Sequence, residues 1–182
     1  SEFEEIPRRY GETYMSEPVI LVINPGSTST RTALYQGKEL IKDRHSDHTP
    51  ADIADCTSTL EQIPMRSACI NGFLKNLSVT INDCSAIAAR GGPLRPVPGG
   101  VYLINDQMLK DASGTEFTDH ISRTACIIAH SLAEKAGIPA YVVDPVSTDE
   151  FKPVSRISGR KELPRRSLVH ALNMRAAARI YA

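Results

Sequence analysis

The sequence has no excess of charge of either sign. It contains 21 lysines and arginines and 21 aspartates and glutamates, so its formal net charge is zero. Overall charge therefore gives the chain no attraction for nucleic acid or for an anionic membrane, and we expect neither as a partner. Any anion site has to be built locally, from a few side chains that the fold brings together.

Long apolar runs and cysteine motifs are also lacking. No stretch approaches the roughly 18 apolar residues that a membrane-spanning helix needs, and residues 1–17 are polar and contain no signal-peptide core. The four cysteines show no C-x-x-C spacing and no partnered histidine motif; they are Cys56, Cys69, Cys84 and Cys126. We therefore expect a cytoplasmic protein with reduced thiols, in which residues 1–17 are a tail before a single domain of residues 18–182.

What the sequence does contain is a strong strand followed by a hydroxyl-rich turn. Residues 19–23 are consecutive apolar residues, mostly β-branched, and predict a strand buried on both faces. Pro25 and Gly26 end this strand, and four serines and threonines follow before Arg31 opens a second strand. The turn offers hydroxyl donors, backbone N–H groups and a permanent positive charge, a set suited to polyphosphate, although an ordinary hairpin turn is an open alternative. It is not a Walker loop, because the Gly-x-x-x-x-Gly-Lys pattern is missing and a strand follows it.

Two charged residues stand at the ends of predicted buried strands. Arg90 follows the apolar run 85–89 and precedes two glycines, which let a ligand approach the backbone closely. The alternative for Arg90 is an ion pair with a neighbouring carboxylate. Asp144 follows the apolar run 140–143 and precedes a proline, at the place where open α/β sheets carry functional groups. The alternative for Asp144 is capping of the next turn.

The other predicted elements follow from periodicity and from helix start and stop signals. They are strands over 39–44 and 101–105 and helical segments over 50–60, 65–77, 106–109, 119–137 and 166–182. His45 and His48 have no third ligand nearby, which favours a solvated connection over a metal site. The last helix has no stop signal, so we expect the chain to be part of a longer protein.

Four stretches resemble the acetate and butyrate kinase family, in the family's order and with similar spacing. Residues 23–31 resemble the family's Asn-x-Gly-Ser-Ser-Ser signature, and Arg90-Gly91-Gly92, Val143-Asp144-Pro145 and the segment 165–173 around His170 follow. The sequences Asn-Pro-Gly-Ser-Thr-Ser-Thr and His-Ala-Leu-Asn within these stretches favour the butyrate kinase branch. The resemblance extends over residues 19–182.

The resemblance implies an α/β fold, namely an actin-like ATPase domain with a mixed central sheet flanked by helices. Residues 18–182 would be the amino-terminal domain of a two-domain kinase whose carboxy-terminal domain is absent from this chain. The implied reaction is reversible phosphorylation of a short-chain fatty acid, butyrate foremost, by ATP with Mg²⁺. The full-length enzyme would be a homo-oligomer, and this chain alone would be inactive. Open alternatives are a kinase for branched-chain fatty acids, propionate or acetate, and a non-catalytic actin-like nucleotide-binding module.

The same resemblance implies roles for individual residues. Arg90 would hold the carboxylate and stabilise the transferred phosphoryl group, His170 would donate a hydrogen bond to that group, and Asp144 would orient Arg90 or a Mg²⁺-bound water. The implied phosphate-binding residues are Asn24, Ser27, Thr28, Ser29 and Arg31, of which Asn24 also belongs to the Mg²⁺ shell. His120 and Val169 would line the acyl site with Arg90, and helix capping is the alternative for His120. Acetate kinases have a phenylalanine in place of Val169, so valine leaves room for a longer acyl chain.

Overall fold

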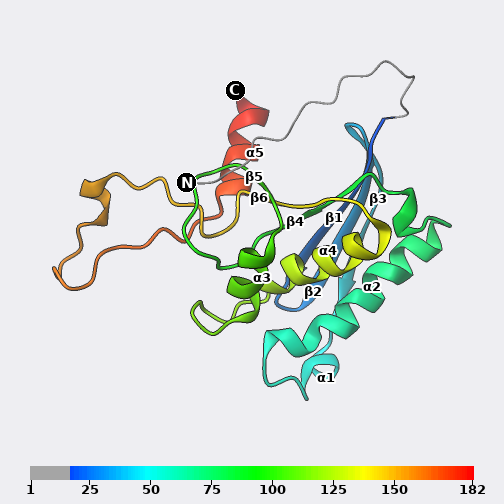
Figure 1. Ribbon diagram of the computed structural model, residues 1–182, viewed down its shortest axis with the longest axis horizontal. Coiled ribbons are helices and arrows are strands. Elements are labelled where there is room, and N and C mark those ends of the chain that lie inside the picture. Colours follow the sequence, from blue (N-terminus) through cyan, green and yellow to red (C-terminus); the bar gives the residue numbers. More distant parts are fainter. Residues whose placement is uncertain (1–16) are drawn as a thin grey trace.

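A computed structural model describes residues 17–182, so the expected tail over residues 1–17 lies outside the described part except for Glu17. Six strands form one sheet in the order β3-β2-β1-β4-β6-β5 (Figure 1). Their bounds are Val19–Gly26 for β1, Ser29–Gln36 for β2, Glu39–Asp47 for β3, Ala86–Ala89 for β4, Val101–Leu103 for β5 and Ala140–Val143 for β6. The pairs β1 with β4 and β4 with β6 are parallel, and the other three pairs are antiparallel. The sheet is therefore mixed, as predicted.

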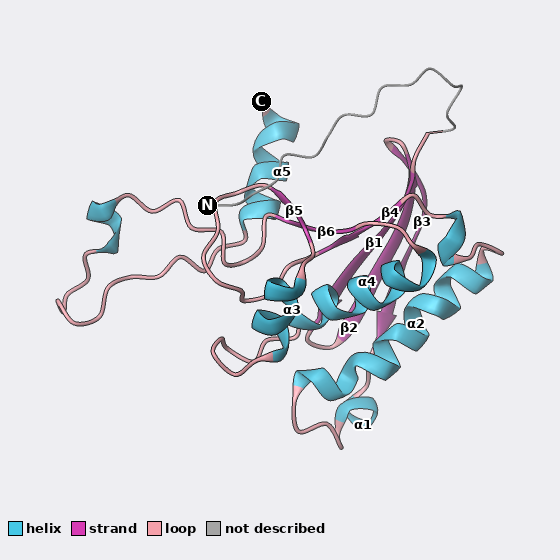
Figure 2. Cartoon of the chain, in the orientation of Figure 1, coloured by secondary structure: helices cyan, strands magenta, loops and turns pink. Residues whose placement is uncertain are grey.

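Helices α2 and α4 cover one face of this sheet, and α5 stands apart from them (Figure 2). The helices are α1 (Pro50–Ile53), α2 (Ile63–Asn76), α3 (Asp106–Ser113), α4 (Arg123–Ala136) and α5 (Ala171–Tyr181), with short 3-10 turns at Thr59–Gln62, Ile81–Asp83 and Pro153–Arg156. The core lies between α2, α4 and the central strands, where Leu21, Ile87 and Ile128 are almost fully buried. None of the described helices has both the length and the apolar character needed to cross a membrane.

The predicted burial of β1 on both faces is wrong. Leu21 and Ile23 are buried under the helices, whereas Ile20 and Val22, which alternate with them, are only partly buried. Successive side chains of a strand point to opposite faces, so this alternation means that the face of β1 opposite α2 and α4 is only partly covered. In the described part of the chain, the apolar residues of β1 thus alternate between a face that is buried in the core and a face that is only partly covered.

All five helix predictions need new boundaries. The helix predicted over 65–77 is α2, Ile63–Asn76, and the one predicted over 106–109 extends to Ser113. The segment predicted over 50–60 is only a four-residue helix, α1, closed by a capping box between Thr49 and Asp52. The long helix begins at Arg123 rather than at residue 119 and ends, as predicted, at Gly137, whose φ is 66°. The last helix begins at Ala171 rather than at residue 166, because the residues before it form an extended segment in which the Val169 N–H donates to the Val146 carbonyl.

The strand predicted over 39–44 extends to Asp47 and therefore includes His45. The prediction that His48 is solvated is wrong. His48 is buried, and its Nε2 lies 2.7 Å from the Thr30 hydroxyl oxygen. His45 instead pairs with Asp47 across 3.2 Å at the exposed sheet edge. The two histidines thus have different surroundings and different partners.

Candidate functional site

Three of the predicted site residues lie at one edge of the sheet. Because β1, β4 and β6 are parallel, their carboxyl ends meet at the same edge. Asn24 lies near the end of β1, Arg90 follows β4 directly, and Asp144 follows β6 directly. The turn between β1 and β2 leaves the sheet at this edge as well.

Arg90 connects two distant stretches of the chain at this edge. Its guanidinium donates to the Asn24 side-chain oxygen over 3.4 Å and lies 2.8 Å from Nδ1 of His170, which is 80 residues further along the chain. A guanidinium can only donate, so Nδ1 of His170 accepts and the imidazole proton is on Nε2. The Nε2–H group of His170 is therefore left as a hydrogen-bond donor beside Arg90.

His120 lies within the electrostatic influence of this pair. Its Nδ1 accepts a hydrogen bond from the Ser122 N–H over 3.2 Å and lies 2.7 Å from the Ser122 hydroxyl oxygen. Desolvation, together with the positive charge of Arg90, lowers the pKa of His120 below its ordinary value. The neutral form of His120 is thus favoured, and His120 lies near the positive charge of Arg90. It also precedes α4, so its contact with Ser122 is compatible with the capping alternative.

Asp144 has a different partner from the one predicted. Its side chain accepts from the Gly100 N–H over 2.9 Å and from the Arg175 guanidinium over 2.7 Å, rather than from Arg90. Capping of the following turn does not occur either, since the Thr148 hydroxyl donates to the Pro145 carbonyl. The φ of Asp144 is 39°, a left-handed conformation that is uncommon outside glycine and asparagine. Asp144 therefore joins the 98–100 turn to α5, and its role toward a Mg²⁺-bound water stays a prediction.

The two glycines after Arg90 are required by close packing. A Cβ on Gly91 would lie 2.4 Å from Cγ1 of Val142, and one on Gly92 would lie 2.5 Å from the Arg123 backbone. Neither neighbour can move easily, because Val142 is in the core and Arg123 begins α4. The glycines thus fix the path of the chain that leaves Arg90.

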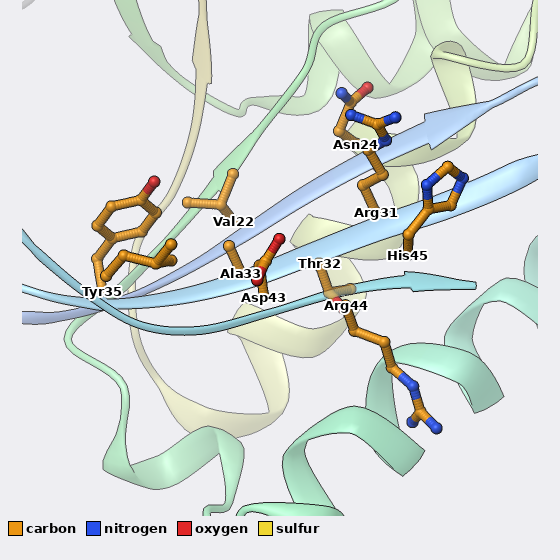
Figure 3. A pocket seen from close by; sticks show the side chains of 10 residues that line it. Val22, Asn24, Arg31, Thr32, Ala33, Tyr35, Asp43, Arg44 and His45 are labelled. Atoms are coloured by element: carbon orange, nitrogen blue, oxygen red, sulfur yellow. The ribbon is translucent and has the colours of Figure 1, made fainter.

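The predicted phosphate-binding residues lie around the β1–β2 turn. Ser27 and Thr28 are exposed at its tip, and Ser29 is partly buried. Asn24 and Arg31 are cross-strand partners, and both line an open pocket of about 340 Å³. Figure 3 shows their side chains close together at one end of that pocket, with His45 beside them. This end of the pocket lies on the half-open face of the sheet.

One residue that sequence reasoning missed is Arg66, on α2 beneath this turn. It is fully buried, and its guanidinium donates to the Ser29 carbonyl over 2.7 Å and to the Thr30 hydroxyl oxygen over 2.9 Å. A signal was present in the sequence, because Arg66 precedes Ile70 and Phe73 at the i, i+4, i+7 spacing of a buried helix face. An arginine in such a stripe either reaches solvent or serves buried acceptors, and the sequence does not say which.

Val169 is partly buried beside His170, and its backbone is fixed by the hydrogen bond to Val146. Ser167 strengthens the same segment by donating to the Thr148 carbonyl over 2.7 Å. Val169, His170 and Arg90 are therefore neighbours in one region. Whether an acyl chain binds there stays a prediction.

The chain is similar in sequence to proteins described as butyrate kinases. It is 39% identical over 160 residues to a protein described as a probable butyrate kinase of Listeria innocua, which covers 88% of this chain and 45% of that protein. It is 40% identical over 163 residues to butyrate kinase 2 of Clostridium acetobutylicum, which covers 90% of this chain and 46% of that protein. Over most of its length the chain is thus similar to part of proteins described as butyrate kinases.

The chain spans less than half the length of these relatives. No established family profile matches it. Among solved structures, acetate kinase from Entamoeba histolytica has a TM-score of 0.52 at 13% identity, over 79% of this chain and 39% of that one. This likeness concerns the fold, which is an α/β fold of the actin-like ATPase type, as predicted.

The described residues offer few side chains that could together bind a metal ion. Residues 17–182 contain no group of three or more histidine, cysteine, aspartate or glutamate side chains that could hold one. Mg²⁺ characteristically keeps several waters and binds through substrate phosphates with few protein ligands. The oxygen atoms at the turn, which are those of the hydroxyls and of the Asn24 amide, are of the kind that Mg²⁺ accepts as ligands.

Proposed function

We propose that the complete protein is a kinase that transfers the γ-phosphoryl group of ATP reversibly to a short-chain fatty acid, butyrate foremost. The observation that carries this proposal is the contact of one guanidinium, that of Arg90, with both Asn24 beside the serine-threonine turn and His170 before α5. The relatives described as butyrate kinases support it, although this chain spans about 45% of their length. In this proposal residues 18–182 form the amino-terminal domain of a cytoplasmic, homo-oligomeric enzyme, and the adenosine site lies elsewhere in the protein.

The chemistry of the reaction matches these groups. A fatty-acid carboxylate titrates near pH 4–5, so it is already ionised at pH 7 and needs no general base. The obstacle is repulsion between the carboxylate and the phosphate chain. Arg90 would neutralise part of this charge and hold the carboxylate, and the Nε2–H group of His170 would donate to the phosphoryl oxygens. Ser27, Ser29 and Arg31 would hold the phosphates that remain on the nucleotide.

The direct test uses the complete protein, ATP, Mg²⁺ and a series of linear and branched acids from two to five carbons. Acyl phosphate is trapped with hydroxylamine and measured as the hydroxamate. We expect product with all components, most efficiently with butyrate, and none without ATP. Nucleotide binding without any acyl phosphate would contradict the kinase and support a nucleotide-binding module instead. Residues 17–182 alone are expected to give no turnover.

The acyl-chain preference can be tested separately at Val169. A phenylalanine at this position would fill the space that we assign to about two methylenes, each worth roughly 0.8 kcal/mol when buried. The Val169→Phe variant should therefore lose about tenfold in kcat/KM for butyrate relative to acetate. Leu168→Phe is the matched control, because Leu168 is 64% exposed and should leave the preference unchanged. An unaltered ratio in the Val169 variant would remove Val169 from the acyl site.

A further inference from the structure

We propose that Arg66 is a positioning residue of the β1–β2 turn, which holds the turn's backbone in the shape that binds the phosphates of ATP. The inference deepens the proposed function and rests on it, since it takes the turn to be the phosphate site. Arg66 would act through the turn without touching the nucleotide.

All five N–H groups of the Arg66 side chain have an acceptor. Two pair with the Gln62 side-chain oxygen, from Nε over 3.2 Å and from one terminal nitrogen over 2.8 Å. The others donate to the turn, namely to the Ser29 carbonyl over 2.7 Å, the Thr30 hydroxyl oxygen over 2.9 Å and the Ser27 carbonyl over 3.4 Å. Three of the five contacts thus go to residues 27–30. Such a fork fixes the direction of several acceptors at once.

These contacts turn the backbone donors of the turn outward. In a trans peptide the C=O and the following N–H point in opposite directions, and no described peptide bond is cis. The Ser27 carbonyl faces Arg66, and the Thr28 carbonyl accepts from the His48 N–H over 2.7 Å. The N–H group of Thr28 therefore points away from Arg66, and that of Ser29 points away from the His48 N–H. Outward N–H groups in a turn are what an anion needs.

The charge of Arg66 has no counterion in the described part of the chain. None of the ion pairs between described residues includes Arg66, although its side chain is fully buried. Desolvation lowers the pKa of its guanidinium, and its positive charge in turn contributes to the lowered pKa of His48. A buried unpaired charge is unfavourable. A polyphosphate on the outer side of the turn would offset that cost, because charges interact strongly across a low-dielectric layer.

The test compares Arg66→Gln and Arg66→Lys with Arg123→Gln in the complete protein. Arg123 is a matched control, because it is also a buried arginine and donates to the carbonyls of Ala112 and Gly114, in another loop. We measure kcat, KM for ATP and for butyrate, the unfolding midpoint, and hydrogen exchange of the peptide that covers residues 24–34. Arg66→Gln should raise KM for ATP at least about tenfold, leave KM for butyrate unchanged, and speed exchange in the turn. Arg66→Lys should show a smaller rise in KM for ATP and a smaller increase in hydrogen exchange than Arg66→Gln. Arg123→Gln should lower only the unfolding midpoint.

Two outcomes would overturn the inference: an unchanged KM for ATP in Arg66→Gln, or an equal rise of that KM in Arg123→Gln. If Arg66→Gln does not fold, Thr30→Val decides, since it removes one acceptor of Arg66 and keeps the shape of the side chain. Thr30→Val should raise KM for ATP and should make hydrogen exchange in the turn faster. If the unaltered protein makes no acyl phosphate, the proposed function fails. Exchange in the turn and calorimetric binding of ATP then still test Arg66 on their own.

Discussion

The guanidinium of Arg90 can only donate hydrogen bonds, and this property decides which nitrogen of His170 carries the proton. Nδ1 accepts from Arg90 over 2.8 Å, so the proton is on Nε2. A hydrogen-bond donor thus stands next to a permanent positive charge. Both groups favour the negative charge that develops on a phosphoryl group in transfer.

We predict different losses for variants of these two residues. Arg90→Gln should lower kcat by roughly 10³–10⁵-fold, the range known for an arginine that stabilises phosphoryl transfer. His170→Asn should lower kcat by about 10²–10³-fold, as expected for one lost donor. His170→Gln should retain more activity than His170→Asn, because the glutamine amide nitrogen reaches the place of Nε2. Steady-state kinetics of the complete protein measure kcat for each variant. A higher kcat for His170→Asn than for His170→Gln would mean that the proton is on Nδ1.

Buried His48 gives a pH dependence of stability. Desolvation and the nearby charge of Arg66 lower its pKa in the folded chain below the ordinary value of 6.5. The unfolded chain therefore binds the proton more readily, so the free energy of unfolding should fall as the pH drops from 7 through 6.5 toward the lowered pKa. His48→Gln should flatten this slope in urea titrations at several pH values. His120 contributes with the same sign, so part of the slope should remain; an unchanged slope would contradict the assignment to His48.

Sequence reasoning at this scale reached the residues whose position in a motif carries meaning. Asn24, Arg90 and Asp144 follow buried runs, and such runs can be recognised without a structure. Arg66 and the Arg175 partner of Asp144 could not be predicted. Their contacts join residues 36 and 31 positions apart, and only the tertiary packing of α2 and α5 brings them together.

At the scale of elements, α5 is the most weakly packed helix of the site. Of its 11 residues only Ala171 is buried. Arg175 holds it through ion pairs with Asp144 at 2.7 Å and Glu150 at 2.6 Å. Because His170 directly precedes α5, these ion pairs also determine where the imidazole lies.

We predict that Arg175→Met loosens α5 and thereby displaces His170. Hydrogen exchange of residues 171–181 should become faster and kcat should fall, while the global free energy of unfolding decreases by about 1–3 kcal/mol because buried Asp144 loses a partner. Arg179→Met is the control on the same helix, since Arg179 is exposed and makes no ion pair with a described residue. Arg179→Met should change none of these three quantities. Equal effects of the two variants would show that α5 is not held by Arg175.

The helix starts illustrate what local sequence does and does not decide. Gly137 ends α4 as predicted, because a left-handed residue closes a helix wherever it occurs. The starts at Arg123 and Ala171 were missed, since side-chain and backbone contacts with distant segments keep the preceding residues out of the helices. Thr59, for example, donates to the carboxylate of Asp119.

For the whole molecule, the central asymmetry is a sheet with one face under helices and one face half open. The family resemblance predicted the mixed sheet, whereas apolar runs alone suggested a strand buried on both sides. The run 19–23 does not distinguish these cases, because partly exposed Ile20 and Val22 are as apolar as their buried neighbours.

This asymmetry predicts unequal losses from two neighbouring substitutions in β1. Ile23 is 1% exposed, so Ile23→Ala should lower the free energy of unfolding by about 2–5 kcal/mol. Val22 lies on the half-open face, so Val22→Ala should lower it by about 1 kcal/mol or less. Urea titration of this chain measures both. Equal losses would mean that other residues cover the second face.

The outer strand β3 has a consequence for solubility. All but one of its nine residues are exposed, and its unpaired backbone edge is open to pairing with another chain. Lysine, arginine, aspartate and glutamate side chains along it, including Lys42, Asp43 and Arg44, oppose such pairing because a second strand would have to bury or match them. The charged side chains of this outer strand thus protect the molecule against aggregation.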